Sequence, residues 1–459
     1  MSLILLASGA VLTASFFFGG GAHRHVSDLV PVLLACGLIL LCLPSVLPRL
    51  REDGLLRAVL AGALIVLVLQ FAPMPPSLWS ALPGRGELLE MYAQSGVSPP
   101  WASLALRPGE AARSALAVLP GIALFLAVIG LDSNQRQKLV YIVIGAALVN
   151  MPLGMLQVLG GQESPLYFFD VTNLGSAVGV FANRNHYAAF FFCALPFVAA
   201  VFAGRKQISG APLWMLGALM AFVMILGLSI SGSRSALILG AAAIAASALF
   251  VARTEIREMM RGRLALVGAG LAVVLVIPLS LGVGLLAILK RFEAQDLAGD
   301  GRVTFAKVTL DAIAAFFPFG AGLGSFQQIY QLREPVTAVI EPIVNHAHND
   351  WLEVALELGL PGLALGVAFM AWVALTVMRT IWLTDLDGRL ARAALVAIAL
   401  LAVHSIWDYP LRTIALSAVF GLCCGLTFRP GVSQVAQVRP SRRRRRKKSS
   451  RRASTPAVT

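Results

Sequence analysis

Two histidines and three carboxylates lie close together near one helix boundary of this chain. His346 and His348 belong to the run Asn345-His346-Ala347-His348-Asn349-Asp350-Trp351, and Glu353 and Glu357 follow. A histidine can accept a proton near neutral pH, so we predict His348 as a general base. The carboxylates at i, i+3 and i+7 predict an acidic stripe on one helix face, able to orient an imidazole or to balance nearby arginines. Predicted substrate-binding residues in this run are His346, Asn349, Asp350 and Glu357.

Three arginines are predicted on the same side of the membrane as these histidines. Arg184 lies in Phe181-Ala182-Asn183-Arg184-Asn185-His186, Arg234 in Ser229-Ile230-Ser231-Gly232-Ser233-Arg234-Ser235, and Arg302 opens an amphipathic segment. A guanidinium group offers a planar fork of donors that suits phosphate oxygens. We therefore predict that Arg184, Arg234 and Arg302 bind a phosphate or diphosphate; the alternative is that they are ordinary arginines at the lipid headgroups.

Other interpretations of the polar residues remain open. The spacing His-x-His-x-Asp also occurs in zinc sites, but few further ligands are available nearby, so no metal and no cofactor are expected. Asp385-Leu386-Asp387 resembles a metal-binding Asp-x-Asp, yet it is predicted on the opposite side of the membrane. His404, Asp408, Tyr409 and Arg412 either line the same cavity as His348 or form a structural network.

The composition identifies the chain as an integral membrane protein. Hydrophobic residues make up 58% and charged residues 13% of its 459 residues, and the mean hydropathy is +0.80, whereas soluble domains are about a quarter charged. The net charge of +14 comes mostly from the C-terminal end, because eleven Lys or Arg and no acid follow Phe428. We predict a membrane domain over 1–428 and a disordered basic cytoplasmic tail over 429–459 that contacts membrane lipids rather than nucleic acid.

The predicted fold is an all-α polytopic membrane protein with about twelve transmembrane helices. Apolar stretches long enough to span the bilayer lie near 2–20, 29–47, 58–76, 111–131, 139–160, 186–204, 211–229, 235–252, 264–289, 360–382, 393–407 and 411–428. The Lys and Arg distribution predicts that both termini are cytoplasmic. A large outer loop over about 290–359, after the ninth helix, is predicted to contain short helices. One of them begins at Asp300 or Gly301, and another begins at Asn349 or Asp350 and ends at Gly359.

The order of these motifs resembles the O-antigen ligase and polymerase superfamily of bacterial polysaccharide assembly. The matching elements are Asn183-Arg184-Asn185-His186-Tyr187, Ser231-Gly232-Ser233-Arg234-Ser235, Arg302 leading to Pro318-Phe319-Gly320-Ala321-Gly322, and His348-Asn349-Asp350-Trp351-Leu352 with Glu357-Leu358-Gly359. Phe305 stands where the family is expected to have a tryptophan, and His346 has no assigned counterpart.

The resemblance implies a metal-independent, inverting glycosyltransferase at the periplasmic face of the bacterial inner membrane. Its donor would be a glycan on undecaprenyl diphosphate, and its acceptor lipid A core or a growing glycan. By this resemblance the three arginines hold the diphosphate, and His348 activates the acceptor hydroxyl. The alternatives are polymerisation of repeat units, transfer to protein, and transport. Transport is disfavoured because the helix interiors carry almost no charge.

Overall fold

The computed structural model describes residues 2–21, 26–169, 173–202, 213–252, 301–339, 343–383 and 385–428. Within these ranges the chain is helical and has no strand; the only β-pairing is an isolated bridge between Met74 and Ala102. Six of the described helices are long and apolar enough to cross a membrane. The predicted all-α membrane fold is therefore confirmed, while the total of twelve spans stays a prediction.

The helices follow the predicted apolar stretches closely. The expected span near 264–289 and the tail 429–459 lie outside the described residues. The helices at the predicted stretches are α1 (Leu3–Phe18), α2 (Leu29–Leu50), α3 (Gly54–Phe71), α6 (Pro108–Ala117), α7 (Leu119–Gly130), α8 (Ser133–Gly160), α9 (Arg184–Phe202), α10 (Leu213–Ile230), α11 (Arg234–Ala246), α16 (Asp350–Thr380), α17 (Leu386–His404) and α18 (Ile414–Thr427). The stretch predicted as one span near 111–131 is divided into α6 and α7 at Val118.

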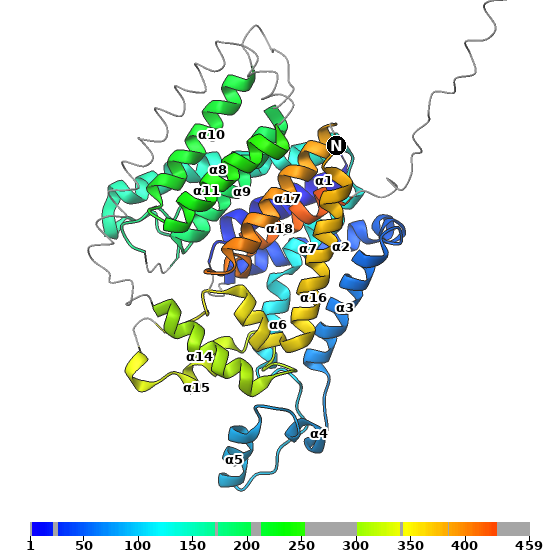
Figure 1. Cartoon of the computed structure of the whole chain (residues 1–459), viewed down its shortest axis with the longest axis vertical. Helices are drawn as coiled ribbons and strands as arrows, with labels where there is room; N and C mark the ends of the chain where they lie inside the picture. The colour runs from blue at the N-terminus through cyan, green and yellow to red at the C-terminus, as the bar shows by residue number, and fades with distance from the viewer. Residues whose placement is uncertain are drawn as a thin grey trace, which may run out of the picture.

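The central helices pack into one apolar core. α7 lies between α2 and α18, and α9 packs against α10, α11 and α17 (Figure 1). α9 is buried along almost its whole length, whereas α3 has only Leu56 and Gln70 buried. The beginning of α1 and the end of α18 lie at the same end of the molecule (Figure 1), as the prediction of two termini on one side requires.

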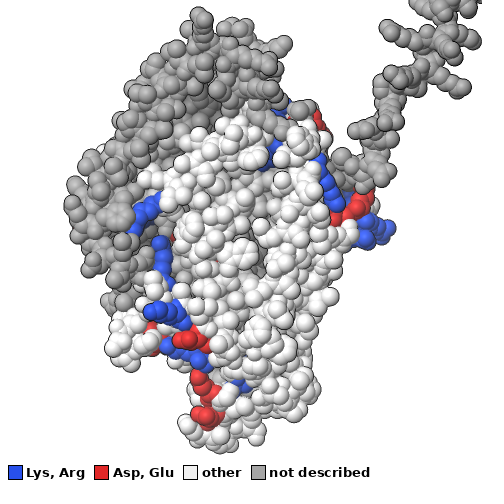
Figure 2. Space-filling model, viewed as in Figure 1, with Lys and Arg blue, Asp and Glu red and all other residues white. Residues whose placement is uncertain are grey.

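Charged side chains on the face shown in Figure 2 gather in two zones, separated by a broad uncharged band. At the end predicted as cytoplasmic, arginines donate to carbonyl groups near helix C-termini. Arg49 donates to Ile129 O at 2.5 Å, Arg136 to Val128 O at 3.2 Å and Arg389 to Ala200 O at 3.2 Å. A cation at a helix C-terminus satisfies otherwise unpaired carbonyls and complements the helix dipole. These arginines therefore cap helix C-termini at the end of the molecule that is predicted as cytoplasmic.

The opposite end carries short helices outside the bilayer-spanning bundle. They are α4 (Pro76–Ser80), α5 (Gly86–Gln94), α14 (Gly301–Phe316) and α15 (Phe326–Arg333) (Figure 1). α14 confirms the predicted amphipathic helix: Phe305, Val308, Ala312 and Phe316 are buried, and Lys307 and Asp311 are exposed. Its buried face packs against α15 and α16.

Arg85 links the first outer segment to α14. Its guanidinium lies over the rings of Trp79 and Phe316, at 5.3 Å and 5.8 Å from their centroids, and donates to Leu104 O at 2.8 Å. Burial lowers the pKa of Arg85 to about 10. This contact helps to fix α14 relative to the segment that carries α4 and α5.

α16 is interrupted at Gly359, which has φ 59° and ψ −145°. One helix was predicted to end there and a spanning helix to follow near 360–382; the structure has both, continuous across the break as α16. The backbone of 318–322 fills the gap: Ala321 N donates to Leu356 O at 2.8 Å, Gly322 N to Glu357 O at 2.9 Å, and Leu360 N to Pro318 O at 2.8 Å. A Cβ atom at Gly359 would overlap Pro318 O. The backbone groups that lose their helical partners at the break are thus paired with the glycine-rich loop after α14.

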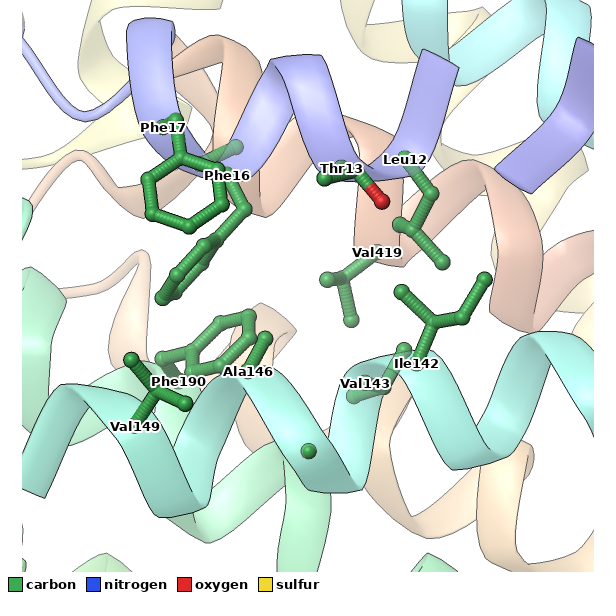
Figure 3. Close-up of a pocket in the computed structure, with 12 residues that line it drawn as sticks. Leu12, Thr13, Phe16, Phe17, Ile142, Val143, Ala146, Val149, Phe190 and Val419 are labelled. Atoms are coloured by element: carbon green, nitrogen blue, oxygen red, sulfur yellow. The ribbon is translucent and has the colours of Figure 1, made fainter. Parts of the chain in front are cut away.

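An apolar cavity of about 200 Å³ lies between α1, α8, α9 and α18 (Figure 3). Its walls include Phe16, Ala146, Phe190 and Val419, and no charged side chain lines it. This cavity lies within the membrane bundle and contributes no titratable group. The chemistry-bearing residues lie elsewhere, at the outer end of the bundle.

Candidate active site

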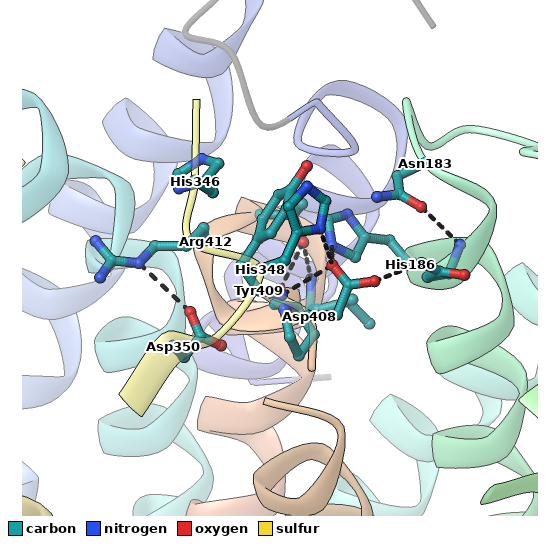
Figure 4. A network of polar contacts seen from close by, with 12 residues as sticks. Asn183, His186, His346, His348, Asp350, Asp408, Tyr409 and Arg412 are labelled. Carbon is teal, nitrogen blue, oxygen red and sulfur yellow. Dashed lines mark hydrogen bonds and ion pairs between the residues drawn. The ribbon is translucent and has the colours of Figure 1, made fainter. Parts of the chain in front are cut away.

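Three segments far apart in the sequence meet at the outer end of the bundle. They are the residues before α16, the corner 405–413 between α17 and α18, and the first turn of α9. Figure 4 shows their side chains converging: His346 and His348 come from the first segment, Asp408, Tyr409 and Arg412 from the corner. His186 of α9 completes the group.

His348 is held with its ring partly open to solvent. Its backbone has φ 52°, in the left-handed region, and its side chain is 23% exposed. The ring stacks on Phe305 of α14, with centroids 5.9 Å apart, and meets the edge of Tyr409 at 4.9 Å. His348 Nδ1 lies 3.7 Å from Asp408 Oδ1, just beyond hydrogen-bond distance. A non-glycine residue in this backbone region is uncommon and favours a functional role.

Asp408 is a fully buried carboxylate between two imidazoles. Asn185 Nδ2 donates to Oδ2 at 2.5 Å, the backbone N–H of Tyr409 donates to Oδ1 at 2.9 Å, and His186 Nε2 lies 3.6 Å from Oδ1. Burial alone would raise the pKa of Asp408, but the adjoining imidazoles of His186 and His348 outweigh it and hold that pKa well below its usual value. The carboxylate is therefore suited to orient His348.

His346 has a different carboxylate partner from His348. Its Nδ1 lies 3.1 Å from both Glu353 oxygens, and Glu353 also accepts a hydrogen bond from Ala347 N at 2.9 Å. The His346 ring stacks on Tyr409 with centroids 4.2 Å apart. The two imidazoles of the His-x-His pair are thus turned toward separate carboxylates, instead of around one common centre.

The acidic stripe is confirmed in position, but its cationic partner is Arg412. Arg412 Nε lies 3.4 Å from Asp350 Oδ1, Nη2 lies 3.3 Å from Glu353 Oε2, and Nη1 lies 2.9 Å from Glu357 Oε2. Burial would lower the pKa of Arg412, but Glu357, Glu353 and Asp350 together raise it above its usual value. The stripe therefore balances an arginine and, through Glu353, contacts an imidazole, and the partners are Arg412 and His346.

The remaining oxygens of the stripe, and the amide of Asn349, are occupied within the protein. Asp350 Oδ2 accepts from Ser405 Oγ at 2.8 Å, and Glu357 Oε1 accepts from Phe326 N at 3.4 Å. Asn349 caps α16 by accepting from Leu352 N at 3.0 Å, and its Nδ2 donates to Ile406 O at 2.7 Å. In this structure Asn349, Asp350 and Glu357 bind other parts of the chain.

The three predicted arginines stand in the first turns of helices at this end of the molecule. Arg184 begins α9 two residues before His186, and Arg234 begins α11, which packs against α9. Arg302 is the second described residue of α14, one turn before the ring of Phe305 that stacks on His348. Backbone N–H groups and the helix dipole make the N-terminus of a helix favourable for anions.

Two buried amides of α8 position the segment that leads to Arg184. Gln157 Oε1 accepts from Val178 N at 3.0 Å and Gly179 N at 2.6 Å, and Asn150 Oδ1 accepts from Val180 N at 3.0 Å. These residues were not singled out in the sequence. The available signal was their spacing of seven in an apolar helix, which places both amides on one face.

Asp385 and Asp387 serve local structure at the other end of α17. Asp385 accepts from Gly388 N at 3.1 Å as the helix N-cap, and Asp387 accepts from Ser133 Oγ at 2.6 Å. They do not lie with the other candidate residues. The Asp-x-Asp motif is therefore separate from the candidate site.

Comparison with known protein families gives a match over part of the chain. Residues 219–367 match the family model described as O-antigen ligase. This range contains Arg234, Arg302, His346, His348 and the acidic stripe; Arg184, Asp408 and Arg412 lie outside it. No curated protein matches the chain. The match confirms, over residues 219–367, the resemblance to the O-antigen ligase and polymerase superfamily that the sequence motifs carry.

Proposed function

We propose that the protein is an O-antigen ligase-like glycosyltransferase. It transfers a glycan from undecaprenyl diphosphate to an acceptor hydroxyl, that of lipid A core, at the periplasmic face of the inner membrane. The observation that supports this most directly is that His348, which lies in the family-matched part of the chain, is placed against the buried carboxylate of Asp408. An imidazole with a carboxylate behind one nitrogen and space at the other is suited to general base catalysis.

In the proposed reaction, His348 accepts a proton from the acceptor. With Nδ1 directed at Asp408, the Nε2 nitrogen is left to take the hydroxyl proton as the acceptor oxygen attacks the anomeric carbon. The separation of 3.7 Å between Nδ1 and Oδ1 is of the kind that shortens when substrate binds. A single displacement from the side opposite the diphosphate inverts the configuration at the anomeric carbon.

Arg184, Arg234 and Arg302 bind the diphosphate in this proposal. The electron pair of the breaking carbon–oxygen bond moves to the diphosphate oxygen, and guanidinium groups stabilise the charge that develops there. Their location in first turns adds backbone N–H donors and helix dipoles of the same sign. The arginines therefore take the charge-neutralising role that a divalent metal has in many glycosyltransferases, and no metal or cofactor takes part.

The test uses purified protein, glycan-bearing undecaprenyl diphosphate and lipid A core, without divalent metal. We expect transfer by the wild-type protein and a fall in kcat of about 10²–10⁴-fold in His348→Ala. Arg184→Ala and Arg234→Ala should weaken donor binding, whereas Arg113→Ala, an exposed arginine paired with Glu110, should not. Full activity of His348→Ala would reject the general base, and unchanged donor affinity in both arginine variants would reject the diphosphate site.

The molecule that accepts the glycan distinguishes a ligase from a polymerase. The same assay with further donor in place of lipid A core tests the second candidate, polymerisation of repeat units, which would use the same base and arginines. Only the family description favours ligation. Products that lengthen by repeat units and never appear on lipid A core would assign the protein to the polymerases.

A further inference from the structure

The corner that carries Asp408 and Tyr409 is attached to α16 on both sides. Before Asp408, Ser405 Oγ donates to Asp350 at 2.8 Å, Asp350 N donates to Ser405 O at 2.9 Å, and Trp351 Nε1 donates to Ala402 O at 3.2 Å. After Tyr409, Arg412 reaches three carboxylates spread over two turns of α16. His348 immediately precedes these turns, so the contacts fix the corner relative to the base.

Arg412 is poorly placed to bind the diphosphate itself. Each of its three guanidinium nitrogens contacts a different carboxylate, and its side chain is only 15% exposed. Three carboxylates around one arginine leave an excess of negative charge, which repels a second anion.

Stability alone gives little reason for such a cluster. Removing charges from water costs several kcal/mol per ion, and a buried ion pair is often no more stabilising than well-packed apolar side chains. What several directional ion pairs do provide is a defined geometry, because a guanidinium group satisfies all its partners in only one orientation. Asp408 lies in the same corner, four positions before Arg412, and its Oδ1 is 3.7 Å from His348 Nδ1.

We propose that Arg412 is a positioning residue for the transfer reaction. Its ion pairs with Asp350, Glu353 and Glu357 hold the corner 405–413 so that Asp408 faces His348 Nδ1. Glu353 couples the same cluster to His346, whose ring stacks on Tyr409. Arg412 thereby acts on the base through Asp408 without contacting substrate. The proposal rests on the proposed function, since it assumes that His348 is the base.

A double-mutant cycle tests the proposal. We expect Arg412→Gln to lower kcat by about 10–100-fold with the donor KM nearly unchanged, because orientation of the base is lost while the diphosphate site is kept. Arg412→Lys should recover part of the rate, since a lysine keeps the charge but not the three-way geometry. The double variant Arg412→Gln with Asp408→Asn should be no slower than Asp408→Asn alone.

The matched control is Arg392, a buried arginine near the other end of α17. It donates to Phe250 O at 2.6 Å and to Leu383 O. Arg392→Gln should lower thermal stability and leave the kcat of the folded protein unchanged. If Arg412→Gln does not fold, Glu357→Gln removes one of the three ion pairs and should lower kcat in the same direction by a smaller factor.

A second readout does not depend on activity. The ¹⁵N NMR signals of His348 report which ring nitrogen carries the proton, and a carboxylate facing Nδ1 favours the proton there. Arg412→Gln and Asp408→Asn should both change the tautomer distribution of His348, and Arg392→Gln should not. Three results would overturn the proposal: an unchanged tautomer in Arg412→Gln, multiplicative rate losses in the double variant, or a donor KM that rises more than kcat falls. A wild-type protein that transfers no glycan would reject the proposed function, and the tautomer would still test the positioning.

Discussion

The ring of Tyr409 contacts three imidazole rings, and each of these imidazoles has a carboxylate as its neighbour. His346 stacks on its ring with centroids 4.2 Å apart, and His186 and His348 meet it edge-on at 4.9 Å. The carboxylate of Asp408 lies next to the rings of His186 and His348, and the carboxylate of Glu353 lies next to the ring of His346. An aromatic ring between the two carboxylate–imidazole systems separates them physically. We therefore expect His348 and His346 to respond differently to substitution of Asp408.

Asp408→Asn should lower kcat by about 100-fold, because an amide neither stabilises the imidazolium nor fixes its tautomer as a carboxylate does. The depressed pKa of Asp408 means that this carboxylate is ionised in the folded protein at every pH above about 4. The stability that it contributes is present above that pH and is lost only as the pH falls further.

Measurements of kcat from pH 6 to 9, and of melting temperature from pH 3 to 8, check both statements. The control is Asp311→Asn, at an exposed position of α14. A rate loss in Asp408→Asn that disappears within the neutral range would show that the carboxylate is protonated there, contrary to the expectation.

At the level of elements, the break in α16 and the loop 318–322 form one unit. The break leaves backbone groups of two turns unpaired, and the loop pairs them through Ala321 N and Gly322 N. Gly320 and Gly322 also have positive φ, 83° and 105°, which L side chains rarely adopt. The first turns of α16, which carry the acidic stripe, are in this way fixed independently of the membrane-spanning part of the helix.

Gly359→Ala should destabilise the protein by about 1–3 kcal/mol or more, because φ is positive and the added Cβ would overlap Pro318 O. Gly366→Ala is the matched control on the same helix, where the nearest atom to an added Cβ is a Trp351 ring carbon at an ordinary 3.5 Å. The measurement is thermal unfolding in detergent. Equal melting temperatures for the two variants would contradict the strain at Gly359.

Elements were predictable from the sequence where one short stretch determines them. Runs of apolar residues located the membrane helices, the apolar face of 301–316 located α14, and Asn349 marked the start of α16. Helices on both sides of Gly359 were predicted, but the way the break between them is bridged was not, because the loop that pairs its backbone groups lies about forty residues earlier in the chain. The anchoring by Gln157 was missed for the same reason, since its partners are backbone groups of another segment.

Across the whole molecule, the candidate site depends on contacts between distant segments. His348 and the three arginines could be selected from local motifs, whereas the pairing of His348 with Asp408 and of the acidic stripe with Arg412 joins residues about 55–60 positions apart. Spacing within one helix predicts which side chains share a face and not which partner faces them. The role of Arg412 therefore emerged only from the packing of α16 against α17 and the corner that follows it.

The proposed orientation places the candidate site in the periplasm, and labelling of single cysteines tests it. In a variant without the five native cysteines, Val97→Cys lies on an exposed outer segment after α5, and Glu52→Cys lies in the exposed turn between α2 and α3. A membrane-impermeant maleimide should label Val97→Cys in intact spheroplasts and Glu52→Cys only after permeabilisation. The reverse pattern would place His348 in the cytoplasm and reject a periplasmic transfer reaction.

The cluster around Arg412 also constrains how the chain is assembled during synthesis. Asp350, Glu353 and Glu357 leave the ribosome well before Arg412, which is added 55 residues after Glu357. Until the corner before α18 is in place, the three carboxylates at the outer end of α16 lack their ion pairs with Arg412. Insertion of the last hairpin therefore completes the ion pairs of these carboxylates, and a chain that ends before Arg412 leaves the outer end of α16 without them.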